Sequence, residues 1–448
     1  MKACEVHLWG TLIGAVSWDR DAHVGRFRYH PDFIDSRIQV APLHMPLGPG
    51  VFRFPQLART SFEGLPGLVA DALPDTFGHA VIDAWLRAQG RPPGSLNPVE
   101  RLAYTGTRGM GALEFAPAMQ LTDAAPADEA LELEALVELA SRTLRERRGM
   151  DLELTDDGSE AERPDLRRLL QVGTSAGGAR AKAVVAWNPD SGQLRSGQTE
   201  LAPGFEHWLL KFDGVAENRD KELADPQGFG LVELAYARMA SEAGIKMTAC
   251  RTFDEGGRHH FMTRRFDRVR VRTKSGAVHT EKLHMASLAG LAHMDYNRAG
   301  AFGYEQAFDV GRRLGLGADE QAELFRRMVF NVVARNQDDH VKNIAYLMDR
   351  RGTWRLAPAF DLTFAYNPSG DWTARHQMSL AGKREGFTPA DLLDVARAAD
   401  LKPRVAAEIV DAVCLAVRAW PDHAEASGVP ADWAAEIGAQ HRLALAGA

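Results

Sequence analysis

The stretch RNQDDHVKN, residues 335–343, follows the apolar, helix-like run ELFRRMVFNVVA and places acids and amides beside a histidine and a lysine. A solvated turn is the simplest interpretation, because surface loops are polar. An interpretation as a functional site requires partner residues elsewhere in the chain. The segments on either side of the stretch therefore decide between the two.

Strand-like segments precede this stretch, and helix-like segments surround it. AKAVVAW, HWLLKFD, TACRTFD and HHFMTRRFD favour strands, which a single predicted helix, FGLVELAYARMASEAG, interrupts. After residue 283 nearly every segment favours a helix. We therefore predict an α+β fold in which a strand-rich lobe precedes an all-helical lobe.

The N-terminal part of the chain has its own mixed pattern. CEVHLWGTLIGAVSWD predicts a hairpin that turns near Gly10, and GRFRYHPDFI predicts a further strand. LPGLVADALPDTFGHAVIDAWLRAQG has helical periodicity interrupted by Pro74. AMQLTDAAPADEA favours a linker and LELEALVELASRTLRERRG an amphipathic helix. The predicted domains are an N-terminal subdomain at 1–117, the linker and helix at 118–150, the strand-rich lobe at 151–280 and the helical lobe at 281–448.

The composition excludes several classes of protein. The 448 residues carry a net charge of −7, which argues against a protein that mainly coats nucleic acid. Cys4, Cys250 and Cys414 are far apart, so we expect neither a zinc site nor a disulfide framework. Because the sequence shows no signal-peptide pattern and no apolar run long enough to span a membrane, we expect a soluble, cytoplasmic protein.

The spacing inside the opening stretch indicates phosphoryl-transfer chemistry. Asp338 and Asn343 have the D-x-x-x-x-N spacing of the protein-kinase catalytic loop, where the Asp accepts the proton of the attacking hydroxyl and the Asn offers an oxygen to Mg²⁺. Lys342 is placed to offset negative charge on the phosphoryl group. Asp361, in RLAPAFDLT, is placed to supply a second metal-binding carboxylate. A transition-metal site at DDH is the alternative, but no second group of ligands has a suitable spacing.

Upstream segments contain candidate partners for this loop. QVGTSAGGARAKAVVAW, residues 171–187, is a glycine-rich turn that precedes a strand, and Ala179 stands where a Walker P-loop needs Lys. A plain hairpin turn is the simplest interpretation, although such turns also let backbone N–H groups approach phosphates. Lys211 lies in an apolar strand-like run, where it either extends to solvent or meets an anion. Glu233 is its candidate partner, or else one more solvated helix acid. His259 and His260 alternate along a strand and are not expected to be ligands.

Taken together, these segments resemble the HipA-like serine/threonine kinases, the toxins of bacterial type II toxin–antitoxin modules. HLWGTLIGAVSWD, LPDTFGHAVID and GTRGMGALEF resemble that family's N-terminal subdomain, TSAGGARAK its glycine-rich loop and RRFDR its R-F-D-R segment. NQDDHVKN resembles its catalytic loop and LAPAFDLT its metal-binding segment. The resemblance covers nearly the whole sequence. It implies a protein-kinase-like bilobal fold that uses ATP and Mg²⁺.

The resemblance also implies a role for each matching residue. Asp338 and Lys342 would be catalytic, Asn343 and Asp361 would bind Mg²⁺, and Ser175 would be autophosphorylated. A phosphoserine would repel the ATP phosphates and silence the enzyme. Many relatives have an acid where this chain has Arg264. The residues implied in ATP binding, with the backbone of 261–263 as the adenine hinge, are Gly173, Thr174, Ser175, Ala176, Gly177, Gly178, Ala179, Lys182, Lys211, Phe261, Met262, Thr263 and His340.

The biological role implied by the resemblance is inhibition of translation. Toxins of this family phosphorylate an aminoacyl-tRNA synthetase, most familiarly the glutamyl enzyme, which favours dormancy; the lysyl and tryptophanyl enzymes are alternatives. The resemblance also implies a HipB-like helix-turn-helix antitoxin that binds the kinase, so that the kinase meets DNA only indirectly, through this partner. Two other functions stay open: a small-molecule kinase on the same scaffold, and a catalytically silent module that binds the antitoxin or assists repression.

Overall fold

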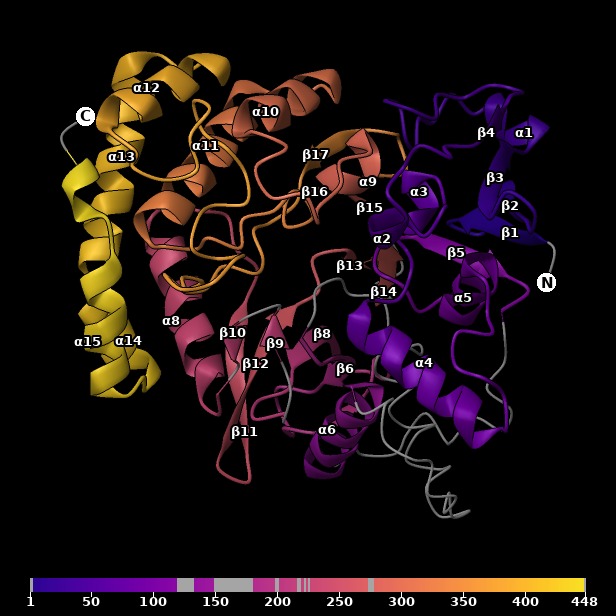
Figure 1. Ribbon diagram of the computed structural model, residues 1–448, viewed down its shortest axis with the longest axis horizontal. Coiled ribbons are helices and arrows are strands. Elements are labelled where there is room, and N and C mark those ends of the chain that lie inside the picture. Colours follow the sequence, from indigo (N-terminus) through magenta and orange to yellow (C-terminus); the bar gives the residue numbers. More distant parts are fainter. Residues whose placement is uncertain are drawn as a thin grey trace. The chain divides into compact units, whose positions relative to one another are not determined.

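The computed structural model divides the chain into two compact units (Figure 1). Unit 1 comprises residues 1–38, 47–227 and 251–284, and unit 2 comprises residues 39–46, 228–250 and 285–448. The residues that the structure describes are 3–118, 133–148, 180–197, 201–215, 219–220, 223–224, 226–272 and 278–446.

Unit 1 begins with a five-stranded sheet of order β4-β3-β2-β1-β5. Its strands are β1 (Ala3–Leu8), β2 (Thr11–Asp19), β3 (Val24–Tyr29), β4 (Val51–Phe52) and β5 (Leu113–Ala116), and each neighbouring pair is antiparallel. The β1–β2 turn contains Gly10 with φ +80°, a conformation that glycine adopts without a steric cost. The predicted hairpin and the strand at 24–29 are confirmed, whereas the end of that predicted strand forms helix α1 (Pro31–Ile34).

Five further helices lie in the described part of unit 1. They are α2 (Arg59–Phe62), α3 (Gly67–Ala70), α4 (Thr76–Ala88), α5 (Pro98–Thr105) and α6 (Leu133–Arg148). The predicted helical periodicity interrupted by Pro74 corresponds to α3 and α4. Pro74 lies between α3 and α4, and the Asp75 carboxylate caps α4 by accepting a hydrogen bond from the Gly78 N–H at 2.7 Å. The amphipathic helix is therefore confirmed as α6, while the predicted linker falls largely on residues outside the described ranges.

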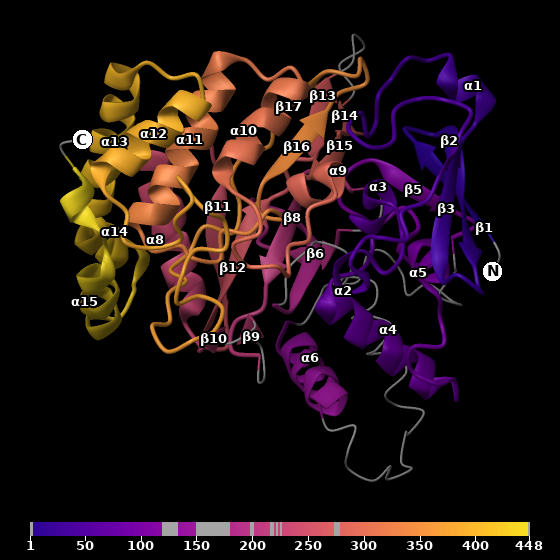
Figure 2. The ribbon, with the colours of Figure 1, turned by 45° about the horizontal axis from the view of Figure 1, so that its top comes forward.

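A second sheet in unit 1 has the order β11-β12-β8-β6-β7. Its strands are β6 (Lys182–Trp187), β7 (Leu194–Ser196), β8 (Glu206–Lys211), β11 (Cys250–Glu255) and β12 (Arg258–Arg264), which confirms the four predicted strands. One face, with Ala183, Leu210 and Met262, packs in a core with apolar residues of α4 and α6, and Figure 2 shows both helices beside this sheet. Two further antiparallel pairs belong to the unit. One consists of β9 (Arg219–Asp220) and β10 (Leu223–Ala224), and the other of β13 (Arg268–Arg272) and β14 (Val278–Lys282).

The R-F-D-R segment that follows β12 is fixed to residues 109–111 by one buried carboxylate. Asp267 Oδ2 accepts hydrogen bonds from the Gly111 N–H at 2.6 Å and from Arg265 and Arg268 at 2.7 Å each. Both arginines also donate to the carbonyl oxygen of Gly109, at 3.1 and 3.2 Å. Burial opposes ionisation of Asp267, but the two guanidinium groups outweigh it and hold its pKa well below the usual value. We call this arrangement the Asp267 clamp.

Unit 2 is mainly helical. Its helices are α8 (Phe229–Glu242), α9 (Leu288–Ala292), α10 (Tyr304–Arg313), α11 (Ala318–Val333), α12 (Pro389–Ala398), α13 (Pro403–Arg418), α14 (Trp420–Ser427) and α15 (Ala431–Gln440), followed by the 3₁₀ turn η1 (Leu443–Leu445). α8 packs against α14, and α11 packs against α13 (Figure 1). None of the helices among the described residues combines the length and apolar character needed to cross a membrane.

The helical region also contains a small sheet, which corrects the prediction of an all-helical lobe. β15 (His284–Ser287), β16 (Ala345–Met348) and β17 (Trp354–Leu356) form a sheet of order β15-β16-β17. These strands have only three or four residues each, too few to establish a period of two, and all four residues of β16 are buried. The catalytic stretch predicted at 335–343 lies between α11 and β16.

Replacing Asp267 with Asn is expected to destabilise unit 1 by about 3–5 kcal/mol, because it leaves two buried guanidinium groups without their counter-charge. Since the pKa of Asp267 is lowered in the folded protein, its stabilisation is present above the unfolded-state pKa of about 3.9 and is lost as pH falls toward the folded-state value. Urea unfolding of the wild type and the variant between pH 7 and pH 3 measures both effects.

Asp254→Asn is the matched control, since Asp254 is an exposed acid that contacts His259 at 2.8 Å. It should change the free energy of unfolding by less than about 1 kcal/mol. Equal stability of the Asp267 variant and the wild type at pH 7 would contradict this account of the clamp.

Candidate active site

The predicted catalytic loop leaves α11 and lies beside the predicted metal-binding segment. The Gln337 N–H donates to the Ala365 carbonyl at 3.0 Å, and the Ala365 N–H donates to the Arg335 carbonyl at 3.1 Å. Asn336 Nδ2 lies 3.5 Å from the carbonyl oxygen of Asp361. The structure therefore brings together, within unit 2, residues of the two segments that are 25 to 30 positions apart in the sequence.

The buried carboxylate of Asp339 holds the loop in place through hydrogen bonds. Its Oδ2 accepts hydrogen bonds from the Tyr304 hydroxyl at 2.7 Å and from His376 Nδ1 at 2.9 Å, and its Oδ1 accepts from the Gln377 N–H at 2.7 Å. Burial alone would raise the pKa of Asp339, but these partners stabilise the carboxylate and hold its pKa below the usual value. The loop is thereby tied to α10 and to the segment that precedes α12.

The C-terminal turn supports the same network. Arg442 lies 2.8 Å from His376 Nε2 and donates to the side-chain oxygen of Gln337 at 2.9 Å. Because His376 Nδ1 donates to Asp339, its Nε2 is free of a proton in the neutral ring and accepts from Arg442. Arg442 is also anchored by its own backbone N–H, which donates to the Val333 carbonyl at 2.8 Å.

Asp338 is half-buried, and its carboxylate has defined neighbours. Trp372 Nε1 donates to Asp338 Oδ1 at 2.6 Å, while His340 Nε2 lies 3.8 Å from Oδ2. A charge-assisted hydrogen bond of this kind stabilises the ionised carboxylate, which is the form a general base requires.

Asn343 is oriented by the loop itself. Its Nδ2 donates to the backbone carbonyl of Asp338 at 2.9 Å, and its own N–H donates to the His340 carbonyl at 2.9 Å. Since the amide nitrogen is used inside the loop, the side-chain oxygen is the end that suits a hard cation.

Asp361 adopts a φ of 53°, in the left-handed region that few residues other than glycine enter. Such a conformation persists only where surrounding contacts enforce it, and it is common at functional sites. Its half-buried side chain and the Asn343 oxygen provide the oxygen donors that Mg²⁺ prefers. Among the described residues no group of three His, Cys, Asp or Glu side chains could hold a metal ion by itself. The donor set fits a hard cation that shares its coordination with a phosphate ligand.

Lys342 rests against an aromatic ring. Its Nζ lies 4.8 Å from the centre of the Tyr296 ring, and that ring lies 6.0 Å from the ring of His340. A cation–π contact limits the motion of a long side chain while keeping its charge. The site residues Asp338, His340, Lys342, Asn343 and Asp361 thus all belong to unit 2.

Three of the ATP-binding residues expected from unit 1, Lys182, Lys211 and Phe261, lie on one face of its second sheet. Lys182, Lys211 and Phe261 are directly opposite one another on β6, β8 and β12, and Lys211 Nζ lies 5.6 Å from the Phe261 ring centre. Lys182 is buried, with its Nζ 3.7 Å from Asp75 Oδ2. The role of these residues in ATP binding stays a prediction.

The predicted adenine hinge, Phe261, Met262 and Thr263, lies inside β12, an internal strand of the sheet. The three residues pair with Lys211, Leu210 and Leu209 of β8. Backbone groups of an internal strand are largely used by neighbouring strands. A hinge at these positions stays a prediction.

The glycine-rich turn and the pairing of Glu233 with Lys211 are two further predictions that stay untested. The glycine-rich turn Gly173, Thr174, Ser175, Ala176, Gly177, Gly178 and Ala179 falls outside the described residues. Glu233 is buried in α8 of unit 2 whereas Lys211 belongs to unit 1, and their pairing also stays a prediction.

The supporting residues of the site were not predicted from the sequence. Asp339 stands next to Asp338, and the doubled acid was the only local sign of it. Four side chains contact the loop from positions far away in the sequence: Tyr304, Trp372, His376 and Arg442. Trp372 is 34 residues from its partner Asp338, and Arg442 is 105 residues from its partner Gln337. No local pattern marks such contacts.

Comparison with known proteins agrees with this architecture. Residues 4–116 match a family model described as the HipA N-terminal domain, and residues 174–420 match one described as the HipA-like C-terminal domain. The chain also aligns over nearly its full length with HipA of Shewanella oneidensis MR-1, solved in complex with HipB and operator DNA. That alignment has a TM-score of 0.65 at 17% identity and covers 99% of this chain and 96% of the other. At this identity it shows a shared fold, in agreement with the predicted α+β architecture.

Two proteins of Sinorhizobium fredii that carry kinase names, Y4dM and Y4mE, are more similar in sequence over shorter stretches. They are 28% and 29% identical to the chain over 210 and 165 residues. These matches cover 44% and 35% of this chain and 47% and 35% of the relatives. The chain thus matches less than half the length of either protein.

Replacing Asp339 with Asn is expected to destabilise unit 2 by about 3 kcal/mol. The variant loses hydrogen bonds to a buried charge, and its amide N–H₂ group faces other hydrogen-bond donors. Because the pKa of Asp339 is lowered in the folded protein, the wild type keeps this stabilisation above about pH 4 and loses it on further acidification. The stability of the variant should lack this dependence on pH. Thermal unfolding across pH 3–7 measures it.

The exposed Asp371, next to Trp372, offers the control substitution Asp371→Asn, which should leave the unfolding curve unchanged. An Asp339 variant with the acid sensitivity and stability of the wild type would show that the network does not hold the loop.

Proposed function

The chain belongs to the family of HipA-like proteins, and from this premise we propose that it is an ATP- and Mg²⁺-dependent serine/threonine protein kinase, the toxin of a toxin–antitoxin pair. The observation that carries the proposal is the packing of the loop with Asp338 and Asn343 directly beside the segment with Asp361. A base, an amide oxygen and a second carboxylate in one place are the parts that phosphoryl transfer requires.

In this mechanism each side chain has a defined task. Asp338 orients the acceptor hydroxyl and takes its proton, while the Trp372 N–H donates a hydrogen bond that fixes the orientation of its carboxylate. Asn343 and Asp361 hold Mg²⁺, which when bound neutralises charge on the β- and γ-phosphates. Lys342 and Lys211 offset the remaining negative charge. Catalysis then comes mainly from positioning and charge neutralisation.

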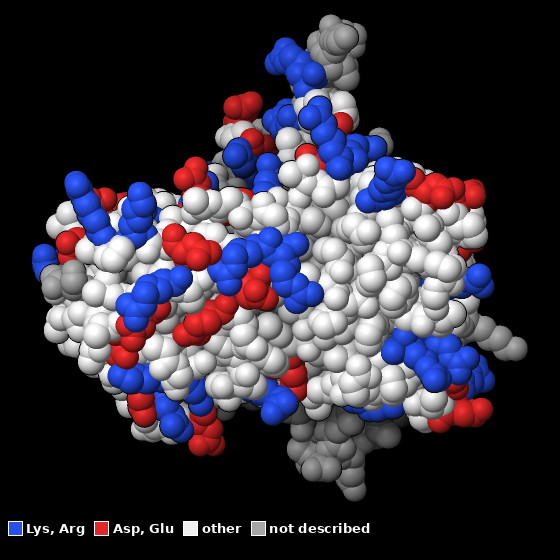
Figure 3. All heavy atoms as spheres, turned by 90° about the horizontal axis from the view of Figure 1, so that it is seen from above, with Lys and Arg blue, Asp and Glu red and all other residues white. Residues whose placement is uncertain are grey.

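The proposed protein substrate is an aminoacyl-tRNA synthetase, with the glutamyl enzyme as the first candidate and the lysyl and tryptophanyl enzymes as alternatives. Its phosphorylation would inhibit translation and promote dormancy. The proposed partner is a HipB-like helix-turn-helix antitoxin, by analogy with the Shewanella oneidensis complex of HipA, HipB and DNA. A net charge of −7 supports contact with DNA through such a basic partner. Basic and acidic side chains are interspersed on the face shown in Figure 3.

Two other functions are weighed against this one. A small-molecule kinase would use the same loop with another acceptor, because a fold does not determine the acceptor. A silent antitoxin-binding module would not need the ordered surroundings of Asp338, and the 2.6 Å bond from Trp372 to its carboxylate favours a chemically active loop.

Asp338→Ala is expected to lower transfer of the γ-phosphate at least about a hundredfold, because it removes the general base, and to leave nucleotide binding largely intact. Asp361→Ala should weaken Mg²⁺-ATP binding as well as transfer. Radiolabelled transfer assays and calorimetric titration with Mg²⁺-ATP separate the two effects, with Asp371→Ala as the exposed control. Full activity in both the Asp338 and Asp361 variants would overturn the site assignment.

Ser175→Ala is expected to give an active kinase that no longer carries phosphate on the glycine-rich turn. The wild type should lose activity as Ser175 is modified, since a phosphoserine of charge about −1.5 to −2 opposes the ATP phosphates. Mass spectrometry of the peptide containing residue 175, before and after incubation with Mg²⁺-ATP, measures this. Unchanged phosphorylation of that peptide in the variant would exclude Ser175 as the modified residue.

A further inference from the structure

Unit 1 contains a cavity of about 860 Å³ that none of the proposed catalytic or ATP-binding residues lines. We call it the basic pocket. Its walls come from the residues around Arg108 and Glu114, from residues 201–207 and from the β13–β14 hairpin. All of these residues belong to unit 1.

The charges around the basic pocket do not balance. Glu114 pairs with Lys282 at 2.6 Å, and Asp267 is shared by Arg265 and Arg268. Five permanent cations therefore face two carboxylates, a net excess of three positive charges, and two of the cations, Arg108 and Arg270, have no carboxylate partner among the described residues. The five cations are Arg108, Arg265, Arg268, Arg270 and Lys282.

Arg108 is a partly enclosed cation that has only neutral partners in the described part of the chain. Its guanidinium donates to the backbone carbonyls of Tyr104 and Thr105 and lies 5.5 Å from the Tyr104 ring centre. Burial lowers the pKa of Arg108, because loss of contact with water disfavours the charged form of its guanidinium group. An enclosed charge without a counter-ion is costly, and a bound anion would offset that cost.

Two more groups in the basic pocket are available to a ligand. Arg270 is exposed and makes no ion pair or side-chain hydrogen bond within the described ranges. His207 Nδ1 is shielded from solvent and has no hydrogen-bond partner. Burial, together with Arg265 and Arg268, lowers the pKa of His207 to about 3, so the ring is neutral and can donate or accept a hydrogen bond.

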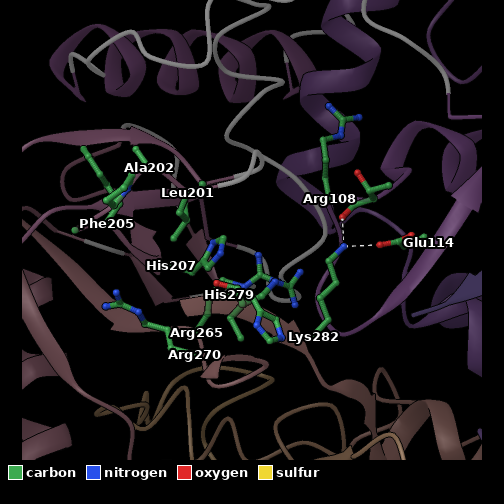
Figure 4. Close-up of a pocket in the computed structure, with 16 residues that line it drawn as sticks. Arg108, Glu114, Leu201, Ala202, Phe205, His207, Arg265, Arg270, His279 and Lys282 are labelled. Carbon is green, nitrogen blue, oxygen red and sulfur yellow. Dashed lines mark hydrogen bonds and ion pairs between the residues drawn. The ribbon is translucent and has the colours of Figure 1, made fainter. Parts of the chain in front are cut away.

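The opposite side of the basic pocket is less polar. Figure 4 shows Leu201, Ala202 and Phe205 on one side, with Arg265 and Arg270 below them, and Arg108, Glu114 and Lys282 on the other side, with His207 and His279 between. Guanidinium groups bind phosphate oxygens through paired donors, and apolar side chains suit a planar ring. The volume lies within the range of about 300–1,000 Å³ that small-molecule sites occupy.

We propose that the basic pocket binds a phosphorylated small molecule of nucleotide size, with a nucleoside diphosphate as the best match. Two phosphate groups supply about three negative charges, given about −1.5 to −2 for a terminal phosphate. The phosphates lie toward Arg268 and Arg270, and the ring lies against Leu201 and Phe205. This site is additional to the proposed kinase site and does not depend on it.

The test is calorimetric titration of the full chain with adenosine diphosphate in the presence of EDTA. Arg270→Ala should weaken binding at least about tenfold, and Arg270→Glu should abolish it, because a charged hydrogen bond is lost or replaced by repulsion. Arg272 is the matched control: it is exposed on the same strand two residues further along but does not line the basic pocket. Arg272→Ala should bind as the wild type does.

Lys211→Ala separates the basic pocket from the proposed ATP site, since binding here should survive that substitution. Equal binding by wild type and both Arg270 variants would overturn the proposal. Inorganic pyrophosphate that binds as tightly as the nucleotide would overturn the role of the apolar side. A phosphoserine peptide that binds in an Arg270-dependent way, where the nucleotide does not, would show that the basic pocket takes a phosphorylated protein segment instead.

Discussion

The candidate active site depends on the buried carboxylate of Asp339. Its oxygens accept hydrogen bonds from Tyr304, His376 and the Gln377 backbone, so α10 and the segment at 376–377 both bind to one charge on the loop. A buried charge is tolerated only when it is fully hydrogen-bonded, and this requirement leaves the loop few alternative conformations. Asp338 and Asn343, which carry the proposed chemistry, lie on the part of the loop that this network holds in place. The reactive residues are thus half-exposed while their support is buried.

Unit 1 also contains a buried carboxylate that is held by hydrogen bonds, but here two of its donors are charged guanidinium groups. In the Asp267 clamp one carboxylate is shared by Arg265 and Arg268, and the two arginines also hold the Gly109 carbonyl. One acid cannot neutralise two bases, so positive charge remains where the clamp borders the basic pocket. An arrangement that stabilises the fold therefore also creates an attraction for anions.

Sequence patterns predicted the parts of this protein that depend on local periodicity and spacing. The hairpin at Gly10, the four strands of the second sheet and helix α6 follow from alternation and helical period. The spacing of Asp338 and Asn343 indicated the loop, and the structure adds that Asp361 lies beside it. The strands β15, β16 and β17 were not predicted because each has only three or four residues, too few to show a strand period between predicted helices.

The supporting contacts escaped prediction for a different reason. Trp372 and Arg442 act through side chains that meet the loop only after the chain has folded, and their own sequence surroundings are unremarkable. Tryptophan and arginine occur in many surface and core positions, so neither residue type indicates a role by itself. Only tertiary structure identifies them.

The central claim is that this chain transfers the γ-phosphate of ATP to a protein. The most direct measurement incubates the purified wild type with Mg²⁺ and ATP labelled at the γ-phosphate, together with a panel of aminoacyl-tRNA synthetases and tRNA. The account predicts label on one synthetase in the panel. Absence of label from every protein, combined with absence of ATP binding, would contradict the kinase and favour an antitoxin-binding module.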